Sequence, residues 1–361
     1  MAFIANEGVA PKGERYDRGA LVKDAKNKNY KKTELGDFIY SSNNLETGSI
    51  GLNNYGNASI SPVYSIFKPT GIADSDFIGR RFVRKDFINA MVKWRQGVVY
   101  GQWKIHESDF LKIEVAVPSL GEQRKIGSYL NNLDNLITLH QRKCEQTKEL
   151  KKFMLQKMFP KKGEKNPEIR FPGFTDDWEQ RKAGEIFKSV SDKGYTDLPV
   201  LSASQELGMI LRDEIGIDIK YDESSIKNYK RVKPGQFVIH LRSFQGGFAW
   251  SDIEGITSPA YTILDYQEPE EHCSKFWKIV LTSPMFITRL ETVTYGIRDG
   301  RSISFTDFST LNLNVPSIAE QQKIGEYFSN LDNLITLHQR KCEQLKELKK
   351  FMLQNMFPKK G

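Results

Sequence analysis

Two short stretches in the second half of the chain hold residue types that read nucleic-acid bases. RSFQGGFAW (Arg242–Trp250) and YGIRDGRSISF (Tyr295–Phe305) set arginine, serine and glutamine beside glycines. Arginine pairs bidentately with guanine and glutamine with adenine, while serine hydroxyls and glycine amides bind phosphates. The same composition also fits hairpin loops with solvated arginines. The predicted DNA contacts are Arg242, Ser243, Gln245, Arg298 and Arg301.

Matching places in the first half carry different polar side chains. A serine and asparagine run, Ser41–Asn44, stands where the first stretch stands, and WRQGVVYGQWK, Trp94–Lys104, stands where the second does. Because base choice depends on side chains, different residues at matching loops predict recognition of different bases. The DNA contacts predicted here are Asn43, Asn44, Arg95, Gln96, Gln102 and Lys104.

Catalytic motifs are missing from the sequence. It contains no GxxxxGK[ST] phosphate loop, no GxGxxG after a strand, no Asn-Pro-Pro-aromatic or Asp-Pro-Pro-Tyr amino-methyltransferase signature and no HExxH. The five histidines form no ligand pattern, and the three cysteines have no metal spacing. We therefore predict a binding protein, not an enzyme, with no catalytic residue, metal or cofactor of its own.

The positive charge is concentrated in two segments. The formal net charge is +8. Residues 117–163 contain ten Lys and Arg against four acids, and residues 315–361 contain eight against five, giving +6 and +3. The remainder is nearly neutral, so charge alone does not locate a DNA-binding face. No apolar run approaches the roughly 20 residues that cross a bilayer, and the start lacks a signal peptide, so we expect a cytoplasmic protein.

These two basic segments are nearly identical. They match at 39 of 47 positions with a constant offset of 198, and LDNLITLHQRKCEQ recurs without change. Each opens with a capping box, Ser119 with Glu122 and Ser317 with Glu320, which starts a helix. Pro160 and Pro358 cannot continue it. The pattern predicts two helices of about 37 residues, each about 55 Å long.

Apolar residues at alternating spacings of four and three form a heptad seam along each predicted helix. Cys144 and Cys342 occupy one seam position in the two copies, which fits reduced, packed thiols. Two such helices can pair antiparallel about a pseudo-twofold axis, as a spacer bar with a domain at each tip; a duplicated dimerisation helix is the alternative. The predicted pairing residues are Ile126, Leu130, Leu133, Ile137, Ile324, Phe328, Leu331, Ile335 and Leu345.

The segments outside the helices also align with each other, weakly. ISPVYSIF from Ile60 matches TSPAYTIL from Thr257, and both regions alternate short β-rich runs, glycine turns and helical stretches. We therefore predict an α+β fold with a pseudo-twofold internal repeat: two mixed domains separated by two long helices that pair as an antiparallel coiled coil. The predicted boundaries are 1–116 for the first domain, 117–160 for the first helix, 161–166 for a linker, 167–314 for the second domain and 315–361 for the second helix.

Three phrases together resemble the specificity (S) subunit of type I restriction-modification systems, over essentially the whole chain. They are VPSIAEQQKIGEYFSNLDNLITLHQRK with its earlier twin, PEIRFPGFTDDWEQRKAGEIF, and RSFQGG followed by SPAYTIL. The resemblance implies two target-recognition domains that each read half of a split double-stranded DNA site. It also implies two partner methyltransferase (M) subunits that methylate adenine, with restriction (R) subunits in some complexes. S-adenosylmethionine, ATP and Mg are then expected on the partners.

The chain departs from the family pattern in its first half. The first domain lacks a counterpart of PEIRFPGFTDDWEQRKAGEIFKSVSDKGYTD, so we expect it to be shortened at its N-terminus and to read its half-site weakly. Two other functions fit the same sequence. One is a truncated relic that only binds partner subunits, and the other is a stand-alone DNA-binding regulator.

Overall fold

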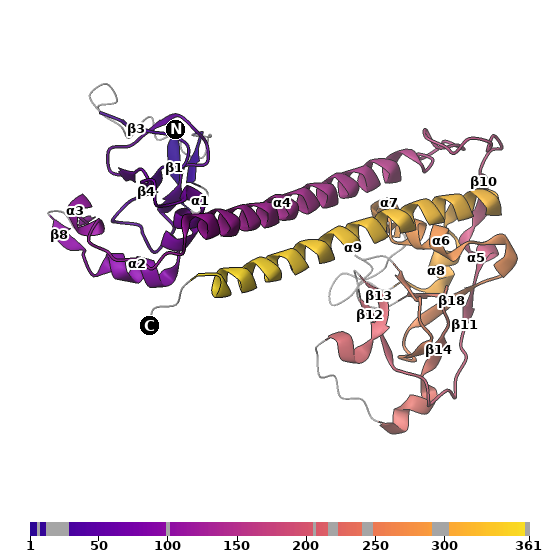
Figure 1. Ribbon diagram of the computed structural model, residues 1–361. Helices are drawn as coiled ribbons and strands as arrows, with labels where there is room; N and C mark the ends of the chain where they lie inside the picture. The colour runs from indigo at the N-terminus through magenta and orange to yellow at the C-terminus, as the bar shows by residue number, and fades with distance from the viewer. Residues whose placement is uncertain are drawn as a thin grey trace. The chain divides into compact units, whose positions relative to one another are not determined.

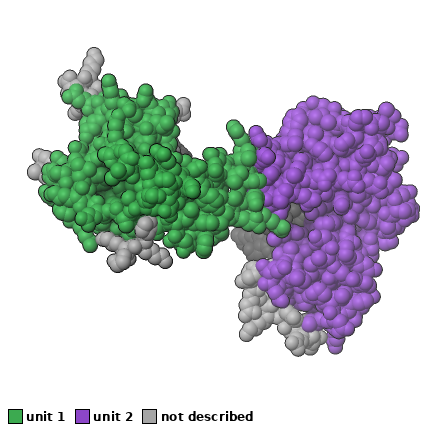
Figure 2. Space-filling view, viewed as in Figure 1, with its two compact units in different colours: residues 1–142, 339–361 green, residues 143–338 purple. Residues whose placement is uncertain are grey.

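The computed structural model contains two compact units (Figure 2). Unit 1 comprises residues 1–142 with 339–361, and unit 2 comprises residues 143–338. Two helices of 38 residues, α4 (Leu120–Lys157) and α9 (Ile318–Asn355), pass through both (Figure 1). The structure describes residues 1–5, 8–11, 29–98, 102–204, 207–215, 223–239, 248–290 and 303–357.

The long helices begin and end where the sequence predicts. The hydroxyl of Ser119 accepts a hydrogen bond from the Glu122 amide at 3.4 Å, and Ser317 does the same for Glu320 at 3.4 Å. Each helix ends three residues before its proline. The α+β class and the antiparallel pairing of the two helices are confirmed, as the next contacts show.

In unit 1 the start of α4 packs against the end of α9. The Cys342 thiol lies 3.6 Å from the Ile137 carbonyl, and Lys349 pairs with Asp134. Along the pair, residue numbers decrease in α9 as they increase in α4, so the two helices are antiparallel. Burial opposes ionisation of Asp134, but hydrogen bonds from Lys349 and Arg80 outweigh it and lower the pKa of this carboxyl. The buried residues of this seam are Ile126, Leu130, Leu133, Ile137, Leu345 and Phe357.

Unit 2 repeats the arrangement with the other halves of the helices. The Cys144 thiol lies 4.0 Å from the Ile335 carbonyl, and Lys151 pairs with Asp332. Both thiols are free, as predicted for packed cysteines. Ile335 itself is only half-buried. The buried seam residues Ile324, Phe328 and Leu331 join the large core of this unit.

The mixed domain of unit 1 is built around strand β4 (Phe38–Tyr40). Successive side chains point to opposite faces, so Phe38 and Tyr40 enter one apolar cluster while Ile39 enters another. Strand β4 lies between β5 (Ile50–Leu52) and β7 (Ser65–Phe67). The other elements are β1 (Ala2–Ile4) with β2 (Gly8–Ala10), β3 (Lys31–Thr33) with β6 (Ala58–Ile60), α1 (Ser75–Phe82), α2 (Lys85–Val92), β8 (Gln96–Val98) with β9 (Gln102–Lys104), and α3 (Glu107–Phe110).

Unit 2 has the same plan with a larger sheet. Its strands run in the order β11 (Phe187–Val190), β18 (Thr262–Tyr266), β15 (Phe237–Ile239) and β16 (Ala249–Trp250). The other strands pair as β10 (Glu179–Lys182) with β19 (Asn312–Val315), β12 (Leu201–Ser204) with β13 (Gly208–Leu211), and β14 (Lys230–Val232) with β17 (Gly255–Thr257). The helices are α5 (Ala183–Ile186), α6 (Ser274–Leu281), α7 (Pro284–Leu290), α8 (Phe305–Ser309), and the 3₁₀ turns Arg212–Ile215, Glu223–Asn228 and Pro269–Glu271.

Equivalent side chains make equivalent contacts in the two domains. The Lys31 ammonium donates to the Tyr64 carbonyl at 2.8 Å, and Lys230 donates to the Tyr261 carbonyl at 2.7 Å. The weak sequence alignment therefore reflects one fold repeated. The run SKFWKIVLTSPMFITRL (Ser274–Leu290), which the sequence predicts as one helical stretch, forms two helices, because Pro284 supplies no backbone N–H to continue the first. No helix within the described ranges is long and apolar enough to cross a membrane.

Candidate nucleic-acid interface

In unit 1 the predicted reading residues lie on one loop and one hairpin. The loop, residues 41–49, joins β4 to β5 and is closed by hydrogen bonds from Ser41 N to Ser49 O at 2.8 Å and from Ser49 N to Asn44 O at 2.9 Å. Strands β8 and β9 form the hairpin. The structure thus brings together two segments separated by about fifty residues of chain.

Short polar side chains tie the loop to the hairpin. The Asn43 side-chain carbonyl accepts from the Trp103 amide at 2.6 Å, and the Ser42 hydroxyl accepts from the Ile105 amide at 3.0 Å. Beneath them the Tyr40 hydroxyl faces the Ile105 carbonyl at 3.5 Å, and desolvation raises the pKa of this phenol to about 12. Asn43, predicted to contact DNA, therefore uses its oxygen to hold the hairpin in place.

Arg95 also binds within the protein. Its guanidinium makes two hydrogen bonds to Glu46, at 3.1 and 2.8 Å, and a third to the Ser42 carbonyl at 3.0 Å. The hydrogen bond from Arg95 lowers the pKa of Glu46, so the pair stays ionised at neutral pH. Sequence reasoning missed Glu46, because two residues 49 positions apart give no periodic signal. In this geometry the guanidinium of Arg95 is already paired with the carboxylate of Glu46.

The remaining predicted residues of unit 1 are open to solvent. Asn44, Gln96 and Lys104 are exposed, and Gln102 lies in β9. Trp103, on the same hairpin, exposes about half of its surface, and Trp94 is exposed where the Lys112 ammonium lies 5.6 Å from its ring. Amide, ammonium and indole groups together suit contacts with bases and phosphates.

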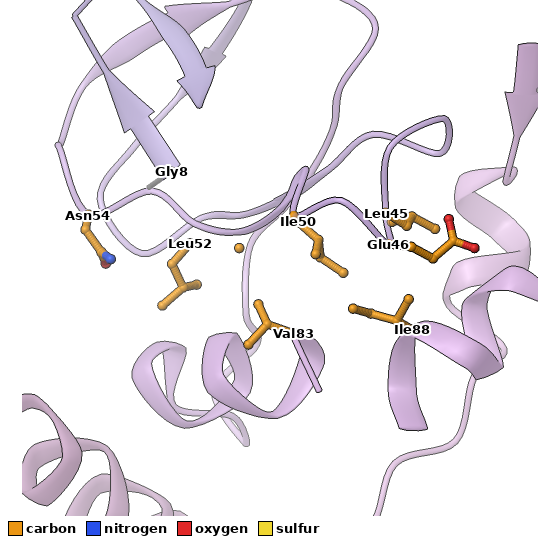
Figure 3. A pocket seen from close by; sticks show the side chains of 10 residues that line it. Gly8, Leu45, Glu46, Ile50, Leu52, Asn54, Val83 and Ile88 are labelled. Atoms are coloured by element: carbon orange, nitrogen blue, oxygen red, sulfur yellow. The ribbon is translucent and has the colours of Figure 1, made fainter. Parts of the chain in front are cut away.

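A hollow lies beside this loop (Figure 3). It has a volume of about 310 Å³ and is bounded by the loop, by strand β5, by Val83 after α1 and by Ile88 of α2. Leu45, Ile50 and Ile88 give it apolar walls, while Glu46 stands at one side. Nowhere in the described part of the chain do three His, Cys, Asp or Glu side chains gather as metal ligands.

The predicted reading residues of unit 2 lie outside the described residues. Arg242, Ser243 and Gln245 fall in 240–247, and Arg298 and Arg301 fall in 291–302. The first range is flanked by β15 and β16, as the loop of unit 1 is flanked by β4 and β5. The second follows α7, as the hairpin of unit 1 follows α2.

A buried glutamine fixes each mixed domain to its long helix. The Gln123 oxygen accepts from the Asp74 amide at 2.9 Å, and its amide group donates to the Ile72 and Pro118 carbonyls at 3.2 and 2.9 Å. In unit 2 the equivalent Gln321 accepts from the Cys273 amide at 3.0 Å. It donates to the Glu271 and Pro316 carbonyls at 3.1 and 3.0 Å. We call each set of three hydrogen bonds the glutamine latch.

A glycine one turn further along lets the domain approach the helix. A Cβ added to Gly127 would lie 2.9 Å from the Asp76 Cβ, and one added to Gly325 would lie 2.9 Å from the Lys275 Cβ. Sequence reasoning used the capping glutamates but missed the glutamines and glycines that follow them. Their recurrence at the same place in both copies was the available signal.

The helix pair leaves large apolar side chains exposed in each unit, and we call four of them in each unit an apolar patch. The two patches are made of the same residue types at positions that the repeat relates to one another. Apolar side chains that are exposed next to one another commonly mark a partner surface. They are Leu136, Leu139, Leu348 and Phe351 in unit 1, and Leu334, Leu337, Leu150 and Phe153 in unit 2.

Comparisons with known proteins agree with this architecture. The family model described as the type I restriction modification DNA specificity domain matches residues 10–149 and 270–347. The crystal structure of a type I restriction-modification system S subunit from M. genitalium has the same fold. It is 14% identical, with a TM-score of 0.55, and the match covers 92% of this chain and 85% of that one.

Two curated proteins of Methanocaldococcus jannaschii are similar in sequence. The type I restriction enzyme MjaVIII specificity subunit is 26% identical over 293 residues, covering 74% of this chain and 65% of that protein. The putative type I restriction enzyme MjaX specificity subunit is 22% identical over 291 residues, covering 76% and 64%. The matched part of the chain thus spans just under two thirds of the length of either relative.

Proposed function

This chain belongs to the type I restriction-modification DNA specificity family, and from that membership we propose that it selects the DNA site on which partner subunits act. In this role each mixed domain reads one half of a bipartite site. Methyltransferase (M) subunits methylate adenine there, and restriction (R) subunits add cleavage. S-adenosylmethionine, ATP and magnesium belong to those partners, and this chain contributes recognition without catalysis.

The main support for this proposal is that the glutamine latch is the same in both units, whereas the loops of the two mixed domains differ. Gln123 and Gln321 hold their domains through the same three kinds of hydrogen bond. The segments that follow β4 and β15 differ completely, SSNN against HLRSFQGG. The two domains are attached to their helices in the same way but carry different loop side chains. This is what recognition of two different half-sites requires, because the loop side chains determine which bases are bound.

In unit 1 the contacts divide the predicted residues into two roles. We assign Asn44 and Gln96 to adenine edges and Lys104 to a phosphate, because these side chains are exposed. Asn43 and Arg95 are positioning residues, since hydrogen bonds within the domain engage them. Asn44→Ala should change base preference in one half-site, whereas Lys104→Ala should weaken binding uniformly and reduce its salt dependence.

In unit 2 the proposed base contacts are arginines. Arg298→Ala or Arg301→Ala should relax recognition of the second half-site, at a cost of about 1–3 kcal/mol for a bidentate guanine contact. Binding to a set of single-base variants of the site measures this. If binding to all variants of the site were weakened equally, the arginine would contact a phosphate. If binding were not weakened at all, the arginine would make no contact with DNA.

The exposed apolar patches are our candidates for docking two M subunits. Each unit offers one patch of three leucines and a phenylalanine, so the stoichiometry of two follows from the repeat. Leu139→Glu with Leu337→Glu should abolish co-purification with M while leaving the fold intact, because both side chains are exposed. Exposed Glu145→Gln with Glu343→Gln is the matched control, for which co-purification should persist.

The deciding experiment is co-expression with a matching M subunit in a host without adenine methylation. Mapping N6-methyladenine by single-molecule sequencing should reveal one split motif with two defined halves. A motif with one defined half would mean that only one domain reads DNA. Co-purification with M and no methylation would favour the scaffold function, and site-specific binding without M would favour a regulator.

The long helices offer a second test of the same function. One heptad inserted after Arg142 and another after His338 preserves the seam pattern, because seven residues return the stripe to the same face. Each insertion adds about 10 Å of helix. The nonspecific spacer of the methylated motif should lengthen while both half-sites stay unchanged. A motif with the original spacer would show that the helices do not set the distance.

A further inference from the structure

The hollow of unit 1 lies at a position where unit 2 carries a tryptophan. Leu52 of β5, which lines the hollow, pairs with Phe38 across the sheet. Trp250 of β16 pairs in the same way with Phe237, the counterpart of Phe38. Because an indole is much larger than the side chain of leucine, this position takes up more space in unit 2 than in unit 1.

The helix that faces this position differs as well. Gly79 is the fifth residue of α1, and Lys278 is the fifth residue of α6. In unit 1 the Leu52 side chain lies over the glycine, since a Cβ added to Gly79 would stand 2.2 Å from the Leu52 Cγ. In unit 2 the Lys278 ammonium lies 4.2 Å from the centre of the Trp250 ring. An indole and an ammonium thus lie between strand and helix in unit 2, whereas unit 1 has one leucine there.

A second wall residue is also smaller in unit 1. Ile50 lines the hollow two residues before Leu52, and Phe248 stands two residues before Trp250. The hollow of unit 1 therefore follows from smaller side chains on the same backbone plan. The side chains of unit 2 indicate what such a place accommodates, which is a flat ring system of two fused rings.

The hollow has the size for such a ring. A dry apolar cavity of about 150 Å³ is large enough to hold benzene. The hollow measures about 310 Å³, which is room for two fused rings and a substituent. Leu45, Ile50, Leu52 and Ile88 provide apolar walls for the faces of the ring.

A carboxamide at one end of the hollow gives it a polar contact. Asn54 lies at the opposite end of the lining from Glu46 (Figure 3). Asn54 is exposed, and its amide has no hydrogen-bond partner within the described residues. Asparagine pairs bidentately with adenine, because its amide donates to N7 and its oxygen accepts from the 6-amino group. Apolar walls with a carboxamide at the end therefore suit a purine better than a hydrocarbon.

We propose that the hollow binds a single purine ring. The faces of the ring contact Leu52 and Ile88, and its amino edge pairs with Asn54. Two sources supply such a ring: a free purine nucleoside, or an adenine extruded from DNA that the neighbouring loop, residues 41–49, holds. Only the second source rests on the proposed function, since a free nucleoside needs no DNA.

Calorimetric titration of the full chain with adenosine tests the site. We expect saturable binding of one adenosine per chain. Asn54→Ala should weaken it about tenfold, because the bidentate contact is lost. Inosine carries an oxygen in place of the amino group, so it should bind the original chain about tenfold more weakly than adenosine. The Asn54→Ala chain should not distinguish the two nucleosides. Asn57→Ala, at an exposed asparagine outside the hollow, is the matched control and should leave binding unchanged.

The difference between the units supplies a second variant. Leu52→Trp gives unit 1 the side chain of unit 2 and should abolish binding, whereas Leu52→Met, of similar volume, should keep it. Hydrogen exchange locates the ligand, since the amides of Ser41 and Ser49 close the loop and should exchange more slowly with adenosine present. Circular dichroism checks that the tryptophan variant folds; if it does not, the Asn54→Ala result decides. Undiminished binding to a folded Leu52→Trp chain would overturn the proposal.

Duplexes with 2-aminopurine distinguish the two sources. In complexes with M on the mapped methylation site, one adenine at a time is replaced by this fluorescent base, which brightens when it leaves the stack. Brightening that Leu52→Trp removes would identify DNA as the source, whereas adenosine binding without such a signal would identify a free purine. Absence of both would overturn the proposal. Continued methylation in that case would leave the proposed function standing.

Discussion

Unit 1 and unit 2 start from related sequences and share their internal contacts, yet they bury their sheets to different extents. In both, an equivalent lysine donates to the carbonyl of an equivalent tyrosine, and both carry the glutamine latch. Unit 2 adds residues 167–190, whose Phe187 and Trp178 join its largest apolar cluster. The difference shows that a segment flanking a domain can decide whether neighbouring residues become a strand, since 312–315 form one and 114–117 do not.

The largest effect that probes this comparison comes from the seam. Leu133→Asp in unit 1 and Leu331→Asp in unit 2 each place a carboxylate in an apolar cluster, and each should cost at least about 4 kcal/mol. Urea unfolding followed by circular dichroism measures the loss. Leu139→Asp changes an exposed leucine of the same helix and should stay within about 0.5 kcal/mol. If a buried substitution lowered the free energy of unfolding no more than this control does, the seam would have to be assigned to other residues.

Arg170→Ala should affect unit 2 alone. It leaves the buried Glu320 without its partner, which costs about 3 kcal/mol for a buried ion pair. Hydrogen exchange should show faster opening of β10 and β19 with unchanged rates in unit 1, which has no equivalent pair among its described residues. Lys165→Ala removes an exposed pair with Asp177 and should leave the exchange rates of both units unchanged. Equal effects of the two substitutions would contradict the assigned role of Glu320.

The latch should respond alike in both units. Gln123→Leu or Gln321→Leu leaves one amide and two carbonyls without their partner, a loss of about 2 kcal/mol. Exchange of the Asp74 amide should accelerate in the first variant and that of the Cys273 amide in the second. Gln141→Leu, at an exposed position of α4, is the control. If only one unit responded, the two latches would not be equivalent.

The smallest expected difference is in pH dependence. His272 is buried in unit 2, where desolvation and the nearby Arg181 lower its pKa, and Ala73 stands at the equivalent place in unit 1. The unfolded histidine titrates near pH 6.5 and binds the proton more readily, so unit 2 loses stability as pH falls below about 6.5. Stability from this group is fully present above that range.

His272→Ala should remove this sensitivity. The change in melting temperature between pH 7.5 and 5.5 should shrink, because alanine binds no proton. Comparing each protein with itself at two pH values separates titration from the packing cost of the substitution. An unchanged pH difference would assign the sensitivity to other groups.

The sequence predicts the long helices because their signals are local. Capping residues, a heptad repeat and terminal prolines each act within a few residues, so α4 and α9 begin and end as expected. The repeated α+β plan follows from aligned glycines and strand residues. The prediction missed the break between α6 and α7, although Pro284 cannot continue a helix.

Contacts between distant residues are what the sequence does not reveal. Glu46 meets Arg95 across 49 positions, and Gln123 meets Asp74 across 49 as well. Neither pair has a period or a motif, and both depend on how loops close in three dimensions. The residue types of this segment therefore predicted Arg95 as a base contact, although in the fold its guanidinium is paired with a carboxylate.

The latch has one more consequence. Both glutamines bond only main-chain atoms of the mixed domain, an amide and a carbonyl, and the side chains at those positions differ: Asp74 and Ile72 against Cys273 and Glu271. The helix thus recognises a backbone shape that both mixed domains present, whatever their side chains at these positions. A domain can be replaced by a distant relative, with new loops and a new core, and still dock on an unaltered helix. Exchange of whole domains therefore requires no compensating change at this joint.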